Sequence, residues 1–592
     1  MTVAELAASI NPSPASYLKA ARCVAAGDVP GLRPLRMGVL STFTAQFLAP
    51  YLQVEGALRG LAVAPWFAPW GQLEEQALGE HSELHAQKCD AIVVLARLEE
   101  LDPVMQERSL AMSDAEKMER LAALEARFES LIGGLRQRTK CPLFVANFPP
   151  PAIPSEGLSA PSLSHSQAAL TEMFNHTLSA LCRRLPDVFV FDLARIANEH
   201  GTADWFDAKL YFLARVPFGA SAQISVAKAL VRTVRAALVP PAKVLVLDLD
   251  GTLWGGVLGE DGVGGIALGD EYPGNVFKVF QKYVRNLRDR GVLLAIASKN
   301  NEADVAEVFA RHADMALRRD DFAAVRIDWR EKSGNLREIA AELNVGLDSL
   351  VFFDDSAFER EEVRRALPTV TVLDVPASPL GYVDAIEQSG VFDRLTLSAE
   401  DRQRTDLYRD QAVRAAAERA ASSSGDFLQS LGLVATIGAV DADTLLRVAQ
   451  LLAKTNQFNL TTRRHSAAEI QAMIDAGAVA LWLRLADRFG DHGLVGAALA
   501  VAENGVARID TLLLSCRVIG RGAETALLAE LAGRVGGKAG VLVGEYVPTA
   551  KNAQVADFFP RHGFAPAGEG RWQLALPSAS LTTPAFIELR HA

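Results

Sequence analysis

Residues 244–252 read VLVLDLDGT, an apolar run that ends in two aspartates, a glycine and a threonine. The run predicts a buried strand, and in a parallel sheet ligands bind at the carboxyl ends of the strands. Asp248 and Asp250 stand at such an end. Two carboxylates this close repel each other unless a cation neutralises them, and Mg²⁺ prefers hard oxygen ligands. A carboxylate can also attack phosphorus and form an aspartyl-phosphate, so the stretch predicts phosphoryl transfer.

The residues around this stretch predict an α/β domain with a parallel sheet. Two further short buried strands are expected at 292–297 and 350–353, separated by helices near 275–290, 302–311 and 334–343. Phosphoryl transfer depends mostly on positioning and charge neutralisation. A hydroxyl, an ammonium and two more carboxylates suit that chemistry, and polar residues at the ends of these elements supply them: Ser298, Lys299, Asn300, Lys332, Asp354 and Asp355.

This constellation resembles the haloacid dehalogenase superfamily of phosphotransferases, and the resemblance covers the whole middle domain. It implies that Asp248 is the nucleophile and Asp250 the general acid/base. It also implies a substrate-binding set and a metal set: Thr252, Ser298, Lys299, Asn300 and Lys332 for the substrate, and Asp248, Asp250, Asp354 and Asp355 for Mg²⁺. Only about 20 residues separate the first strand from the helix near Asn275, so no large cap domain fits and an open site could accept a bulky or protein-bound substrate.

Length and composition divide the rest of the chain. Its 592 residues are too many for one hydrophobic core, and 49% hydrophobic with 22% charged residues is an ordinary globular mixture. Pro240-Pro241 cannot continue the helix expected before it, and a softer break follows at 376–379. We therefore expect an α/β multidomain protein with three domains, at 1–240, 241–380 and 400–592.

Charge, cysteines and the N-terminus limit the partners and the location. The net charge of −11 repels phosphate backbones, so nucleic acid is not an expected partner. Five cysteines without C-x-x-C spacing indicate neither a disulfide framework nor a structural zinc site. The N-terminus lacks a basic head before an apolar stretch, and no segment reaches the roughly 18 apolar residues of a membrane span. We expect a soluble, cytoplasmic protein without a membrane partner.

The first domain alternates strand-like runs with long helical patterns, an order that predicts a parallel sheet with covering helices. These elements are expected at 35–40, 91–95, 114–136 (the helix), 143–146 and 188–191. The domain resembles the SGNH-hydrolase fold, because Gly38-Val39-Leu40-Ser41 ends its first strand and Asn147 ends a later one. The Asp-x-x-His that supplies the base of such hydrolases occurs nowhere in the chain. We therefore expect a binding or carrier-docking role in place of hydrolysis at Ser41.

The third domain predicts an α+β fold with strands near 478–485, 494–501 and 507–514. Residues 516–523, CRVIGRGA, follow the last strand and open a helix at 524–531, so their glycines let backbone N–H groups approach a phosphate. The turn resembles the R-x-x-G-x-G turn of the Gcn5-related N-acetyltransferase (GNAT) fold, which holds the phosphates of a pantetheine arm. The matching residues are Arg517, Gly520 and Gly522.

Three features of this domain each have two interpretations. Cys516 could be a nucleophile, because a helix N-terminus lowers a thiol pKa, or a buried structural cysteine. His492, in the sequence GDHG, could act as a base or be merely solvated in a loop. The polar run 454–464, which contains Asn456, could line a ligand cleft or be only a helix end that turns into a loop.

Taken together, residues 246–262, 455–464 and 515–517 resemble the FkbH-like family, a haloacid dehalogenase-like phosphatase of subfamily IIIC fused to a GNAT-like domain. The resemblance implies an enzyme that takes D-1,3-bisphosphoglycerate, removes its phosphates and delivers a glyceryl group as a thioester to an acyl carrier protein in polyketide biosynthesis. The implied cofactors are Mg²⁺ and the phosphopantetheine arm of the carrier. The thiol of Cys516 or of the carrier would displace the activated 1-phosphate. Asp248, Asp250 and Mg²⁺ would hydrolyse the 3-phosphate ester.

The chain departs from the family at 354–360, DDSAFER, where the family commonly has Asp-Asp-Asn-Pro before its Glu-Arg. The metal carboxylates are retained, but the substrate stays open. One alternative is a Mg²⁺-dependent phosphatase or acyltransferase for another phosphorylated metabolite, such as a surface-polysaccharide precursor. Another is a scaffold that binds carrier proteins without chemistry. An acidic carrier would need a local basic patch, for which the sequence offers Arg463, Arg464, Arg517 and Arg521.

Overall fold

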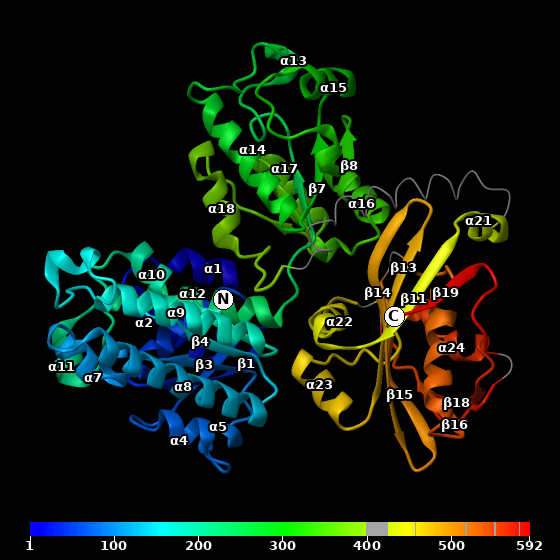
Figure 1. Cartoon of the computed structure of the whole chain (residues 1–592). Helices are drawn as coiled ribbons and strands as arrows, with labels where there is room; N and C mark the ends of the chain where they lie inside the picture. The colour runs from blue at the N-terminus through cyan, green and yellow to red at the C-terminus, as the bar shows by residue number, and fades with distance from the viewer. Residues whose placement is uncertain (398–423, 456, 516–517, 550–551, 579–580) are drawn as a thin grey trace. The chain divides into compact units, whose positions relative to one another are not determined.

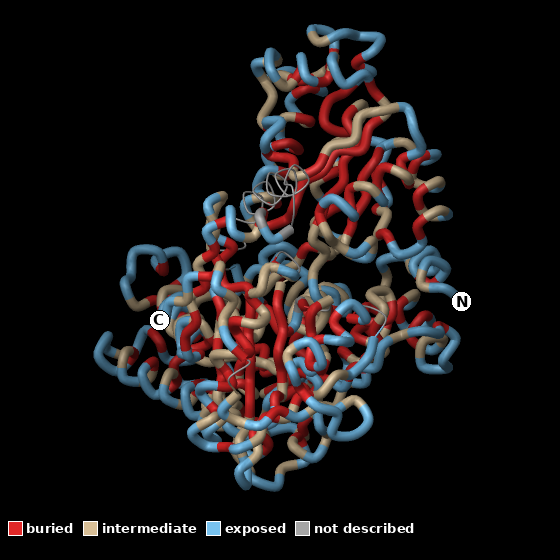
Figure 2. Tube along the Cα trace, turned by 90° about the vertical axis from the view of Figure 1, so that its right-hand side faces the viewer, coloured by how far each residue is buried: buried red, intermediate tan, exposed pale blue. Residues whose placement is uncertain are grey.

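The computed structural model describes residues 1–397, 424–455, 457–515, 518–549, 552–578 and 581–592. The chain divides into two compact units, Met1–Val239 and Pro240–Ala592, and the described residues form three separate sheets (Figure 1). Figure 2 shows buried strands inside each part and exposed residues on the loops. The helices of the described ranges include none long and apolar enough to cross a membrane. The expected α/β multidomain class is confirmed.

The first unit is built on a parallel sheet with the order β2-β1-β3-β4-β5. The sequence does not predict β2, because Pro65 interrupts its apolar run. A proline is tolerated there because β2 is an edge strand of the sheet. The strands are β1 Arg33–Ser41, β2 Leu61–Phe67, β3 Ala91–Leu95, β4 Leu143–Ala146 and β5 Val188–Phe191.

Helices cover this sheet, and α8 (Asp114–Arg138) shows how the sequence starts one. The Ser113 side chain accepts a hydrogen bond from the Glu116 backbone N–H, and the Glu116 side chain accepts one from the Ser113 N–H. The apolar side of α8 packs with α4 and α9 against the sheet. The other helices are α1 Val3–Ser9, α2 Pro14–Ala25, α3 Ala49–Ala57, α4 Leu73–Leu78, α5 Glu83–Ala86, α6 Leu98–Leu101, α7 Pro103–Glu107, α9 Gln167–Arg184, α10 Leu193–His200, α11 Ala208–Ala214 and α12 Ala220–Leu238.

The second unit begins with another parallel sheet, in the order β10-β9-β6-β7-β8. Alternate residues of its central strand enter different cores, because Leu245 and Leu247 pack with α14 and α18 while Val244 and Val246 pack with α16 and α17. The elements are β6 Val244–Leu247, α13 Leu258–Asp261, α14 Gly274–Asp289, β7 Leu293–Ser298, α15 Glu302–Arg311, β8 Phe322–Ile327, α16 Lys332–Glu342, β9 Leu350–Phe353, α17 Ala357–Ala366, β10 Thr371–Val372 and α18 Tyr382–Ser389.

The third sheet is mixed, in the order β17-β18-β16-β15-β14-β13-β11-β19, with the short β12 paired to β15. One core gathers around α24 and a second around α22 and α23. The expected start of a third domain at residue 400 lies outside the described residues. The elements are α21 Ser424–Ser430, β11 Leu433–Ala439, α22 Ala442–Lys454, β12 Phe458–Asn459, α23 Ala467–Asp475, β13 Val479–Asp487, β14 Gly490–Glu503, β15 Val506–Leu514, α24 Ala523–Gly536, β16 Val541–Glu545, α25 Phe558–Arg561, β17 Ala565–Pro566, β18 Arg571–Ala575 and β19 Ile587–His591.

Candidate active site

The candidate active site lies at the carboxyl edge of the middle sheet. Asp248 follows β6, Asp354 follows β9 and Ser298 ends β7, and these three strands are neighbours. Because the strands are parallel, their ends meet at one edge. The Asp248 backbone N–H donates to the carbonyl of Phe353 at 3.2 Å, which extends the β6–β9 ladder to the first aspartate.

One ammonium joins two of these carboxylates. Lys332, the first residue of α16, is only 2% exposed, and its Nζ lies 3.0 Å from Asp248 Oδ1 and 2.5 Å from Asp354 Oδ2. Burial opposes the charge on Lys332, but the two carboxylates outweigh it and raise the pKa of the ammonium. A charged Lys332 therefore fixes the positions of both aspartates.

The cluster carries more negative than positive charge. Oxygens of Asp248, Asp354 and Asp355 all lie within 4.8 Å of one another. Burial and the charge of Asp248 raise the pKa of both Asp354 and Asp355. Three carboxylate oxygens around one point are the donor set that a hard divalent cation takes, and its charge would relieve this repulsion. The residues therefore fit Mg²⁺.

The carboxylate of Asp250 is held apart from this cluster. Its Oδ1 accepts hydrogen bonds from Trp254 Nε1 at 2.8 Å and from the Leu258 backbone N–H at 3.2 Å, and its Oδ2 accepts one from Asn300 Nδ2 at 2.9 Å. Of the four expected metal carboxylates, the structure thus groups three, Asp248, Asp354 and Asp355, while the carboxylate of Asp250 has its own hydrogen-bond donors.

The turn between the two aspartates needs glycine. Gly251 has φ +68°, and a Cβ there would lie 2.4 Å from Asp355 Oδ2. The buried Thr252 donates through Oγ1 to Asp355 Oδ1 at 3.4 Å. The Tyr382 hydroxyl donates to the Gly251 carbonyl at 2.8 Å. Sequence reasoning misses Tyr382 because it is 131 residues away and belongs to no motif near the site.

The remaining expected substrate-binding residues divide into two groups. Ser298 is buried at the end of β7, and its Oγ accepts a hydrogen bond from Asn300 Nδ2 at 3.4 Å, so both lie beside Asp250. Lys299 differs, because its Nζ donates to Glu359 Oε1 at 2.7 Å. Its charge is therefore already compensated by a carboxylate of α17.

The stretch between β6 and α14 is fully described and contains the short α13 and two isolated bridges, a parallel one from Asp250 to Trp254 and an antiparallel one from Gly255 to Ala267. It forms a small flap and not a cap domain.

The departure at Ser356 leaves the local structure intact. Its backbone N–H donates to Asp354 Oδ1 at 2.9 Å, and its Oγ accepts from the Glu359 N–H at 3.4 Å as the N-cap of α17.

In the third sheet, His492 is buried and not solvated. It lies in β14 and is 1% exposed, and its Nε2 lies 3.0 Å from Asp487 Oδ2 and 3.1 Å from Arg521 Nη1. Gly520 and Gly522 have φ values of +78° and +77°, and Gly522 is the N-cap of α24. Cys516, Arg517 and Asn456 lie outside the described residues.

The arginines that were expected to form a basic patch already have partners, as far as the structure describes them. Arg463 and Arg521 are paired with carboxylates, Arg464 donates to the Ala453 carbonyl, and Arg517 lies outside the described residues. The polar run 454–464 begins at the end of α22 and continues into β12, so it combines a helix end with a strand.

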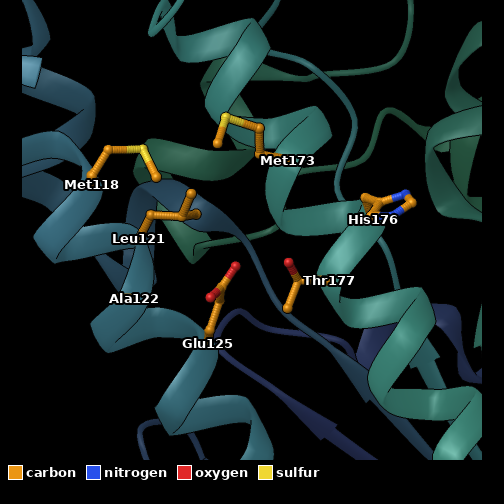
Figure 3. A pocket seen from close by; sticks show the side chains of 7 residues that line it. All are labelled: Met118, Leu121, Ala122, Glu125, Met173, His176 and Thr177. Carbon is orange, nitrogen blue, oxygen red and sulfur yellow. The ribbon is translucent and has the colours of Figure 1, made fainter.

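In the first unit, the groups expected at an SGNH site are bonded to their own surroundings. Ser41 is 5% exposed and donates through Oγ to the Phe43 carbonyl at 2.7 Å, while Asn147 Nδ2 donates to Asp192 Oδ1 at 2.7 Å. A separate apolar pocket of about 280 Å³ lies between α8 and α9. Its lining includes Met118 and Leu121 from α8 and Met173 from α9 (Figure 3). The four described cysteines are free thiols: Cys23, Cys89, Cys141 and Cys182.

Comparisons with known proteins find similar families and structures for parts of the chain. Residues 36–235 match the family described as FkbH, N-terminal domain, which confirms the resemblance to the FkbH-like family. A crystal structure of the N-terminal part of a Bacteroides fragilis protein, containing a phosphatase domain and complexed with Mg, is 28% identical, with a TM-score of 0.55, and covers 65% of this chain and 100% of its own. No curated protein matches the chain.

Two solved acetyltransferases are similar to a smaller part of the chain. The ribosomal-protein-alanine N-acetyltransferase from Brucella melitensis is 18% identical, with a TM-score of 0.19, and covers 24% of this chain and 99% of its own. An N-acetyltransferase from Staphylococcus aureus is 15% identical, with a TM-score of 0.20, and covers 24% of this chain and 98% of its own.

Proposed function

We propose that this chain is a Mg²⁺-dependent phosphatase coupled to acyl transfer, which dephosphorylates D-1,3-bisphosphoglycerate and loads the glyceryl group as a thioester onto an acyl carrier protein. The observation that carries the proposal is the cluster of Asp248, Asp354 and Asp355 around Lys332, with Asp250 held beside it. The phosphatase-domain neighbour supports the same reaction class.

Phosphate removal divides between the two aspartates of the VLVLDLDGT stretch. Bound Mg²⁺ would be held by Asp248, Asp354 and Asp355 and would supply positive charge against the phosphoryl oxygens. Asp248 attacks phosphorus, the bond from phosphorus to the ester oxygen breaks, and an aspartyl-phosphate forms. Asp250 gives its proton to the leaving oxygen and then takes one from the water that hydrolyses the aspartyl-phosphate.

The neighbouring side chains prepare this chemistry. Trp254 and Asn300 hold the Asp250 carboxylate at 2.8 and 2.9 Å, so its distance from Asp248 is set before a substrate enters. Lys332 holds Asp248 in place and offsets part of its charge. Ser298 accepts from Asn300, which leaves its hydroxyl hydrogen able to donate to a phosphoryl oxygen.

The acyl-transfer half-reaction needs less catalysis. The 1-phosphate of the proposed substrate is an acyl phosphate, so the thiolate of the carrier's phosphopantetheine arm can attack the carbonyl carbon and displace phosphate. We assign this step to the third sheet and its turn before α24. Whether Cys516 carries the glyceryl group in between is a separate question, which intact-protein mass spectrometry of the loaded enzyme answers.

The test uses the full chain with 1,3-bisphosphoglycerate, Mg²⁺ and an acyl carrier protein. The carrier should gain the mass of a glyceryl group, and Asp248→Asn should abolish phosphate release from the 3-position. Asp289→Asn, on the exposed surface of α14 beside Arg288, is the matched control and should keep the activity. If other phosphorylated metabolites are turned over and the carrier is never loaded, the substrate is one of those metabolites and not 1,3-bisphosphoglycerate. If the full chain does not hydrolyse an aryl phosphate in the presence of Mg²⁺, the proposal of a phosphatase is wrong.

A further inference from the structure

A groove of about 650 Å³ lies on the third sheet and shares no residue with the carboxylate cluster of the middle sheet. Its volume is in the range of about 300–1,000 Å³ that is usual for small-molecule sites. We name it the β15–β16 groove. Its lining comes from β14, β15, β16 and β18 and from two loops: Arg463, Val501, Glu503, Arg508, Ile509, Asp510, Val543, Glu545, Ala567, Arg571 and Gln573.

The groove lies where two parallel strands separate. β15 and β16 pair only from Val506–Val541 to Arg508–Val543, while β12 pairs with the far end of β15 at Leu513 and Leu514. Beyond Arg508, the side chains of Asp510 and Glu545 line the opening. Two carboxylates on separating strands would repel each other without a cation.

Arg463 supplies that cation. Its Nη1 lies 3.2 Å from Asp510 Oδ1, and its Nη2 lies 2.6 Å from Glu545 Oε2, so one guanidinium joins the two strands. Asp510 also accepts hydrogen bonds from Thr511 Oγ1 at 2.8 Å and pairs with His465 Nε2 at 2.6 Å. The charges of Arg463 and Asp510 are therefore compensated within the protein.

Two other arginines of the groove are not compensated in this way. Arg508 is exposed, and its side chain makes no hydrogen bond or ion pair with the described part of the chain. Arg571 forms one long ion pair, from its Nε to Glu545 Oε1 at 3.8 Å, and its side chain makes no hydrogen bond with the described part of the chain. Guanidinium groups with free donors are suited to planar or tetrahedral anions, which they bind through two parallel hydrogen bonds.

The rest of the lining restricts the class of ligand. Glu503 and Glu545 offer carboxylate oxygens that accept hydrogen bonds from hydroxyl groups, and Val501 and Val543 offer a small apolar floor. A ligand that satisfies all of these groups carries an anionic group and hydroxyl groups on a short carbon chain.

We propose that the β15–β16 groove binds a small hydroxylated anion, with Arg508 and Arg571 as its anion-binding groups. Phosphoglycerates belong to this class, so the inference deepens the proposed function and rests on it for the identity of the natural ligand. It adds a second small-molecule site, in the part of the chain to which acyl transfer is assigned, that would hold the substrate's glycerate part during the thiol step.

The test measures binding of 3-phosphoglycerate to the full chain by isothermal titration calorimetry in the presence of a metal chelator. Without a divalent cation, the carboxylates of the middle sheet repel the ligand, so the binding reports on the groove. Arg508→Gln should weaken binding about tenfold or more, because it removes a charge-assisted interaction. The control is Arg534→Gln on α24, whose partner is Glu530, and it should bind as the wild type does.

Hydrogen exchange locates the site independently of the affinity. Bound 3-phosphoglycerate should slow amide exchange in Val506–Leu514 and Val541–Glu545. Equal affinity in Arg508→Gln and wild type would overturn the proposal, as would protection confined to the middle sheet. If inorganic phosphate binds as tightly as 3-phosphoglycerate, the hydroxyl groups do not contribute to binding, and the proposal of a hydroxylated ligand is overturned. Arg508→Gln should retain Mg²⁺-dependent hydrolysis of an aryl phosphate, so a failure of this site is distinguishable from a failure of the phosphatase.

Discussion

Replacing Lys332 by Met removes the ammonium that joins Asp248 and Asp354 while keeping the aliphatic part of the side chain. The side chain is 2% exposed, and the two contacts that are lost are 3.0 and 2.5 Å long. Removing one partner of a buried ion pair costs about 3–5 kcal/mol, because it leaves a buried charge without compensation. Protonation of Asp354, whose pKa burial and Asp248 already raise, limits the loss to about the lower value.

The matched control is Lys299→Met. Lys299 stands at the same edge of the same sheet and also forms one ion pair, with Glu359 at 2.7 Å, but its side chain is 31% exposed. Partly exposed ion pairs contribute about 0–1 kcal/mol, so this variant should lose far less stability than Lys332→Met. The contrast compares a buried lysine between two carboxylates with a partly exposed lysine beside one, since both changes convert a paired lysine into methionine.

The assay is amide hydrogen exchange of β6, Val244–Leu247, in metal-free buffer, because the chain has several parts and a single unfolding midpoint would mix them. A loss of about 3 kcal/mol corresponds to roughly hundredfold faster exchange. Saturating Mg²⁺ should restore part of the protection, because a bound dication stabilises the folded state by mass action. The reasoning is wrong if Lys332→Met exchanges no faster than Lys299→Met, or if Mg²⁺ slows exchange equally in both.

Three further changes have expected outcomes. Gly251→Ala places a Cβ 2.4 Å from Asp355 Oδ2, so that carboxylate must move, and Mg²⁺ affinity measured by calorimetry should fall about tenfold. His465→Gln should lose stability relative to wild type mainly below about pH 6.5 and progressively less as the pH rises, by amide hydrogen exchange of β15; the Asp510 hydrogen bond raises the pKa of His465, so its contribution is lost as the pH rises through the folded pKa. Asn552→Ala removes two hydrogen bonds that Nδ2 donates to backbone carbonyls, at 3.0 and 2.9 Å, and two that Oδ1 accepts, from the Thr549 N–H at 2.7 Å and the Tyr546 hydroxyl at 3.2 Å; amide hydrogen exchange of β16 should show a loss of about 2–4 kcal/mol.

The sequence predicts the buried parallel strands well. Ala91–Leu95, Val244–Leu247 and Leu350–Phe353 have the predicted bounds, because strands buried on both faces are continuous apolar runs with sharp polar ends. The short strand β12 and the strand β8 are missed for the opposite reason. Phe322–Ile327 contains two alanines and an arginine, and β12 is two residues long, so neither has an apolar run of its own.

The sequence predicts those residues of the candidate site that directly follow a strand or begin a helix. Asp248, Lys332 and Asp354 are each recognisable from the element they follow or open, and the structure brings them together. The pairing of Lys299 with Glu359 and the hydroxyl of Tyr382 on Gly251 depend on how α17 and α18 pack. No spacing in the sequence specifies that packing, so these two contacts require the tertiary structure.

The polar run 454–464 shows why a dense polar motif is weak evidence for a ligand cleft. Thr461 Oγ1 donates to the Asp510 carbonyl at 2.8 Å, and the Thr462 N–H donates to Asn459 Oδ1 at 2.9 Å. Arg463 joins two carboxylates on separate strands. These groups are satisfied by the fold, so they have little left to offer a ligand. Arg508 belongs to no motif, yet its side chain lines a groove and has no hydrogen-bond or ion-pair partner in the described chain. A binding site is better sought among the charges that the fold leaves uncompensated than among the residues that form a motif.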